Sequence, residues 1–141
     1  MPQFRISQES FGITSEKYTV GMTANLQART YDLEDRTLAF AWSVREFVKQ
    51  VPRTQWNGDD CGQLVRSSGS VGANYREAND SLGKRDFLSR IKICRKEAKE
   101  SRYWLDLLVC EKENLDHERI RLRQESLELE RIFGSIVRKL S

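Results

Sequence analysis

The chain has 141 residues, of which 38% are hydrophobic and 32% are charged, and its 24 basic and 21 acidic side chains give a formal charge of +3. A length near ~150 residues is typical of one domain, and this apolar fraction excludes a wholly disordered chain. No apolar run reaches the ~18 residues of a membrane span, and the first 29 residues lack the apolar core of a secretory signal, so we expect a cytoplasmic protein.

Residues 1–30 are polar with isolated apolar side chains, and they predict a flexible N-terminal arm. The remainder, 31–141, predicts four helices. Asp32 can cap the first helix, and Pro52 ends it. Its core stripe at helical spacing comprises Leu33, Phe40, Val44, Phe47, Val48 and Val51. Trp42 lies off this stripe, as either one exposed aromatic residue or a contact to another subunit.

The second helix is expected to begin at a cap formed by Asp59 or Asp60. Its core face comprises Leu64, Ser68, Val71, Tyr75 and Leu82. The run of small residues at 67–73 also fits a loop or a phosphate-binding loop, because glycine weakens an exposed helix. We favour a helix packed closely against a neighbour, since the apolar period continues through the run and no GxxxxGK[ST] motif is present.

The third helix is predicted over about 84–112. Its core face comprises Phe87, Ile91, Cys94, Ala98, Ser101, Leu105 and Leu108. Cys94 is interpreted as a small buried apolar residue. A second apolar stripe, formed by Ile93, Trp104 and Leu107, predicts a further surface to be covered, for which a second subunit is a candidate.

The fourth helix is expected to be capped by Asp116 and to run to about Lys139. Its core face comprises Leu122, Leu129, Ile132, Phe133, Ile136, Val137 and Leu140. Ile120 and Leu127 lie opposite this face, seven residues apart, as a second candidate subunit contact. Four helices with short connections predict an all-α, antiparallel, up-down-up-down four-helix bundle.

The sequence offers little support for catalysis or for a bound cofactor. The one histidine, His117, lies beside a helix start and is interpreted as solvated. No Glu-x-x-His, HExxH or nucleophile-with-base pattern occurs, which argues against an enzyme. Cys61, Cys94 and Cys110 are odd in number and widely spaced, so they predict neither a disulfide framework nor a metal site.

The charge pattern of the third helix is more informative. Residues 84–102 carry eight basic and three acidic side chains. The candidate phosphate contacts are Lys92, Lys96 and Lys99, followed by Arg85, Arg95 and Arg102. A basic stripe on one helix face is typical of a protein that binds the phosphate backbone. Tyr103 falls on the same face and could stack on a base. The alternative is a solvated helix face whose charges pair with Glu97 and Glu100.

Two segments resemble a known bacterial family. They are Tyr31-Asp32-Leu33-Glu34-Asp35-Arg36-Thr37 and Arg66-Ser67-Ser68-Gly69-Ser70-Val71-Gly72-Ala73-Asn74-Tyr75-Arg76-Glu77-Ala78-Asn79. The third helix adds Phe87, Leu88, Ile91, Cys94, Glu97, Ala98, Glu100 and Ser101. The chain resembles the four-helix bundles encoded in intervening sequences of large-subunit ribosomal RNA genes, and the accessory variability proteins of diversity-generating retroelements.

The resemblance implies a homopentamer with a basic surface and no enzymatic activity. It also implies partners, namely RNA, DNA or an RNA–DNA hybrid, and a reverse transcriptase as a candidate protein partner. Arg66, Asn74 and Glu77, at the motif positions, are interpreted as polar structural residues that tie the second helix to its neighbours or to the next subunit. The alternative function is a protein-interaction scaffold with no direct nucleic-acid role.

Overall fold

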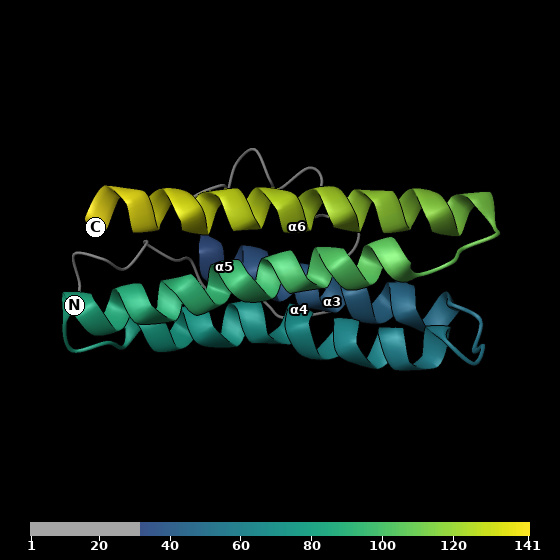
Figure 1. Ribbon diagram of the computed structural model, residues 1–141, viewed down its shortest axis with the longest axis horizontal. Coiled ribbons are helices and arrows are strands. Elements are labelled where there is room, and N and C mark those ends of the chain that lie inside the picture. Colours follow the sequence, from purple (N-terminus) through teal and green to yellow (C-terminus); the bar gives the residue numbers. More distant parts are fainter. Residues whose placement is uncertain (1–31) are drawn as a thin grey trace.

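A computed structural model describes residues 32–141, and the predicted arm at 1–30 lies outside them. The described chain forms four helices, α3 (Leu33–Gln50), α4 (Asn57–Asn79), α5 (Lys84–Leu107) and α6 (Glu113–Leu140). They lie side by side and alternate in direction (Figure 1). Packing of α3 against both α4 and α6, and of α5 against the same two helices, closes the bundle. The predicted four-helix bundle is confirmed.

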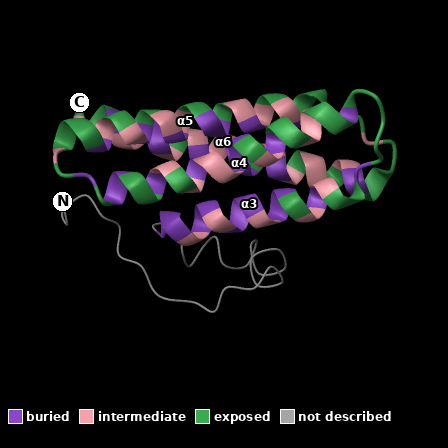
Figure 2. Cartoon of the chain, turned by 90° about the horizontal axis from the view of Figure 1, so that it is seen from below, coloured by how far each residue is buried: buried purple, intermediate pink, exposed green. Residues whose placement is uncertain are grey.

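The core lies along the central axis of the bundle, where all four helices present their apolar stripes (Figure 2). Its largest fully buried side chains include Tyr75, Phe40, Phe47, Phe87 and Phe133. Tyr75 of α4 and Phe133 of α6 pack with their ring centroids 5.7 Å apart. Every residue of the core stripe predicted for α5 is buried, as the 3.6-residue period requires.

The small-residue run at 67–73 is helical throughout, as expected from its apolar period. The reason lies at Gly72, where an added Cβ would stand 2.9 Å from the Thr37 Oγ1 and 3.2 Å from the Thr37 Cβ of α3. Glycine therefore permits a close approach of α3 and α4 that no other residue allows without displacement. The same run contributes Ser67, whose hydroxyl lies 2.9 Å from that of Ser101 on α5.

Three predicted helix ends and one core position were wrong. Helix α4 begins at Asn57, before Asp59 and Asp60, because the Thr54 hydroxyl accepts from the Asn57 N–H at 3.1 Å. Helix α6 begins at Glu113, and Asp116 in its first turn accepts from Arg119 at 2.7 Å. Helix α5 ends at Leu107, since extended backbone at Leu108 carries that side chain into the core.

Leu82 is 95% exposed, although the sequence placed it on the core face of α4. The helix has already ended at Asn79, so the helical period no longer sets the direction of this side chain. The cap predicted at Asp32 is confirmed, because its carboxylate accepts from the Asp35 N–H at 3.3 Å.

A basic groove between helices α5 and α6

Three lysines form a ladder on the outer face of α5. Lys92, Lys96 and Lys99 recur at four- and seven-residue spacing and are exposed. None of them forms an ion pair with another residue of 32–141, although α5 carries several carboxylates. The ladder therefore presents its positive charge to solvent.

Helix α6 supplies a second basic wall. Arg131 and Arg138 lie seven residues apart on α6 and face the ladder across an open groove of about 540 Å³. The groove is lined by Lys92, Arg95, Lys96, Lys99, Glu130, Arg131, Gly134 and Arg138. We call this surface the basic groove. Its one carboxylate, Glu130, forms an ion pair with Arg102, which reduces the negative charge that the groove presents.

Gly134 makes room for two of the arginines that line the groove. An added Cβ at this position would stand 3.2 Å from the Arg138 Nη1 and 3.6 Å from the Arg95 Cδ. The absence of a side chain therefore leaves space beside the α6 backbone for the Arg138 guanidinium and for the aliphatic part of Arg95.

The six predicted phosphate contacts fall into three groups. Lys92, Lys96, Lys99 and Arg95 line the basic groove. Arg85 is exposed near the start of α5, outside the lining. Arg102 is 18% exposed and is held by Glu130, so we do not count it among the groove cations available to a phosphate. Arg131 and Arg138 were not among the predicted contacts, because their seven-residue spacing becomes informative only once α6 is known to face the ladder.

The polar motif residues of α4 bond mainly to α5. Arg66 pairs with Glu97 at 3.3 Å and also with Glu100. The Asn74 Oδ1 accepts from the Arg90 Nη1 at 3.2 Å, and its Nδ2 donates to the Ser70 carbonyl at 2.9 Å. These contacts fit the structural role expected for Arg66 and Asn74.

Glu77, the third motif residue, is exposed, and its side chain has no hydrogen-bond partner within 32–141. Its backbone carbonyl accepts from the Ser81 hydroxyl at 3.3 Å, just after the end of α4. The predicted tie to a neighbouring helix is therefore absent for this residue within the described chain.

The candidate subunit contacts occupy several surfaces. Leu107 and Ile120 are exposed at 44% and 49%, while Ile93 and Leu127 are half-buried. The indole N–H of Trp104 donates to Glu100 at 3.3 Å, which fixes that ring beside the Arg66 ion pairs. Trp42 packs with Leu38 against Ala39, apart from the main core.

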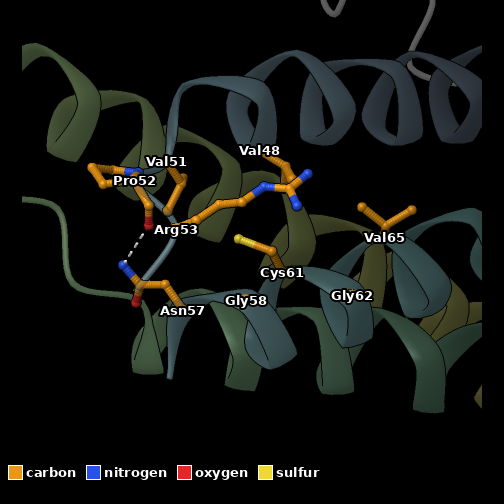
Figure 3. Close-up of a pocket in the computed structure, with 9 residues that line it drawn as sticks. All are labelled: Val48, Val51, Pro52, Arg53, Asn57, Gly58, Cys61, Gly62 and Val65. Atoms are coloured by element: carbon orange, nitrogen blue, oxygen red, sulfur yellow. Dashed lines mark hydrogen bonds between the residues drawn. The ribbon is translucent and has the colours of Figure 1, made fainter. Parts of the chain in front are cut away.

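A second pocket, of about 350 Å³, lies at the end of the bundle where α3 joins α4 (Figure 3). Valine side chains form much of its wall, and the Arg53 guanidinium lies across it near Cys61. Burial raises the pKa of the Cys61 thiol, and the nearby Asp60 carboxylate adds to that effect. The pocket therefore holds no activated nucleophile.

Cys94 and His117 differ in their exposure to solvent. Burial raises the pKa of the Cys94 thiol to about 12, so it stays protonated at neutral pH. His117 is exposed and lies 3.8 Å from Glu113, its neighbour one turn earlier. Across residues 32–141, no group of three or more His, Cys, Asp or Glu side chains could hold a metal ion. None of the four described helices combines the length and apolar character of a membrane span.

The chain is similar to known proteins in both fold and sequence. The fold is similar to that of a solved structure, a protein with unknown function from the S23 ribosomal protein family of Bacteroides thetaiotaomicron. The similarity has a TM-score of 0.64 with 29% identity and covers 74% of this chain and 96% of the other. No curated protein matches the chain. Residues 29–135 match the 23S rRNA-intervening sequence protein family, and the chain belongs to that family.

Proposed function

We propose that this protein is a non-catalytic, homo-oligomeric accessory protein that binds nucleic acid through the basic groove. The observation that carries the proposal is the arrangement of cations on both walls of the groove. Lysines from α5 face arginines from α6, and the one lining carboxylate is already engaged by Arg102. Such a groove fits a polyanion better than a neutral ligand.

The expected mode of binding follows from the groups that line the groove. Lysine acts on a phosphate as a point charge, whereas arginine can donate two parallel hydrogen bonds. Neither group reads base edges when it is occupied by a phosphate, so binding should depend weakly on sequence. A site with about six phosphate contacts should lose roughly a thousandfold in affinity between about 50 and 200 mM salt.

Assembly of several copies would place several basic grooves on one particle. Leu107 and Ile120 are exposed apolar residues that could be covered by neighbouring subunits. We propose a pentamer, by resemblance to retroelement accessory proteins, and a reverse transcriptase as the candidate protein partner. Light scattering on the purified protein tests the subunit number.

The test of nucleic-acid binding is a fluorescence-anisotropy titration with RNA, DNA and hybrid at low and high salt. The variant Lys92→Glu/Lys96→Glu/Lys99→Glu should abolish binding at both salt concentrations. A matched control, Lys49→Glu/Arg53→Glu/Lys112→Glu, changes net charge equally at exposed positions outside the groove and should bind nearly as well as the wild type.

Circular dichroism should show that both variants remain folded, because the substituted side chains are exposed. Equal loss of affinity in the two variants would show that net charge alone drives binding, and it would refute the groove. If the wild type binds no nucleic acid at low salt, the data would favour the alternative hypothesis of a protein-interaction scaffold. In that case an acidic protein partner would bind the basic groove.

A further inference from the structure

An exposed aromatic ring continues the lysine ladder of α5. Tyr103 lies four residues after Lys99, so it falls on the same face of the helix. Its side chain is 55% exposed. From Lys92 to Tyr103, this face of α5 extends about 16 Å, the length of roughly five nucleotides at a rise of ~3.4 Å each.

The surroundings of Tyr103 leave its ring available to a flat ligand. Its neighbour Trp104 meets it at 5.2 Å between centroids and at an interplanar angle of 74°. One neighbouring ring in that geometry can cover at most one face of the tyrosine. The two acidic residues three positions from Tyr103, Glu100 and Asp106, are paired with Arg66 of α4 and with Arg123 of α6. Negative charge beside the ring is therefore partly neutralised.

We propose that the basic groove and Tyr103 together select single-stranded polynucleotide over duplex. The inference rests on the proposed nucleic-acid binding and adds the class of ligand. The strand's phosphates lie between the walls of the groove, and one unpaired base stacks on the tyrosine ring. A base within a duplex has both faces covered by its neighbours in the stack, so it gains nothing from Tyr103.

The energetic consequence differs between the two kinds of ligand. Phosphate contacts are available to any nucleic acid and set the general affinity. Stacking on an aromatic side chain adds a contribution only for an unpaired base, and alanine substitution of such a ring costs about tenfold or more in affinity. The hydroxyl of Tyr103 is not needed for stacking.

The experiment compares labelled single strands of about 12 nucleotides, as RNA and as DNA, with the corresponding duplexes. Wild type should bind the single strands more tightly. Tyr103→Ala should weaken single-strand binding about tenfold and leave duplex binding unchanged. Tyr103→Phe, which keeps the ring, is the matched control and should bind like the wild type.

Several results would overturn the inference. Duplex binding as tight as single-strand binding, or an equal effect of Tyr103→Ala on both ligands, would refute it while the triple lysine variant still supported the proposed function. Loss of single-strand affinity in Tyr103→Phe would refute stacking in favour of a hydroxyl contact. Absence of any binding would remove the proposed function and this inference together.

Discussion

At the scale of single residues, Gly72 sets the distance between α3 and α4. Replacing it with alanine should destabilise the fold by about 1–2 kcal/mol, because the overpacking cost against Thr37 exceeds the gain in helix propensity. Urea unfolding followed by circular dichroism measures the change. Gly69→Ala is the matched control, since its Cβ would meet only the Arg45 guanidinium at 3.8 Å or more. That variant should be at least as stable as the wild type.

A second substitution, at Thr37, should restore much of the stability that Gly72→Ala removes. Thr37→Ala removes the Oγ1 that lies nearest to the added methyl group. In that background, Gly72→Ala should cost much less, which a double-mutant cycle would measure. Equal stability of Gly69→Ala and Gly72→Ala would contradict the close-approach explanation.

A second contact that matters for stability at this scale is the buried ion pair between Arg36 and Glu125. The Arg36 Nε and Nη2 donate to the two oxygens of Glu125 at 2.9 and 2.8 Å, and both side chains are about 5% exposed or less. Arg36→Met would leave Glu125 buried without its cation. We expect a loss of about 3 kcal/mol in the free energy of unfolding at neutral pH.

This loss should depend on pH. Burial raises the pKa of the Glu125 carboxyl above its usual range, while Arg36 opposes the shift. A raised pKa means that this group's contribution to stability is greatest at low pH and declines as pH rises through the folded pKa. In Arg36→Met the pKa rises further, so the deficit relative to wild type should shrink between pH 7.5 and pH 4.5.

Denaturant unfolding at the two pH values measures that change. Lys49→Ala, which removes an exposed pair with Glu46, is the control and should cost less than about 1 kcal/mol at either pH. A deficit in Arg36→Met that grew on acidification would contradict the assignment of the effect to Glu125.

At the scale of elements, Asn57 joins the two connections at one end of the bundle. Its side-chain nitrogen donates to the Pro52 carbonyl before α4 and to the Val109 carbonyl before α6, each at 3.4 Å. Asn57→Ala should cost about 1–2 kcal/mol and speed amide exchange in both connections, with little effect at the other end. Hydrogen exchange with mass spectrometry checks this, and uniform loss of protection would contradict it.

The elements also show which helix boundaries a sequence can predict. The apolar period located all four helices, because burial of one stripe per helix determines that period. The ends were harder, since Asp59 and Asp116 are good caps that this fold uses inside first turns instead. At the start of α4, the Thr54 hydroxyl accepts from the Asn57 N–H, as the side chain of a cap residue would. Nothing in the local sequence shows whether Thr54 or one of the aspartates takes this role.

At the scale of the whole molecule, the sequence alone did not predict which residues far apart in the chain come into contact. Lysine spacing on α5 predicted one wall of the basic groove. The opposite wall depends on the antiparallel register that brings Arg131 and Arg138 of α6 alongside α5. Likewise, Arg36 and Glu125 each look like ordinary surface charges in the sequence. Only the closed bundle brings them together and away from water.

That closure has a consequence for how the chain emerges from the ribosome. Glu125 follows Arg36 by 89 positions, so most of the chain must be synthesised before the arginine can meet its carboxylate partner. Before α6 is present, α3 can pack against α4, while the side of α3 that carries Arg36 remains open to solvent. We therefore expect the Arg36–Glu125 pair to be among the last contacts to form during synthesis, when α6 covers the exposed side of α3.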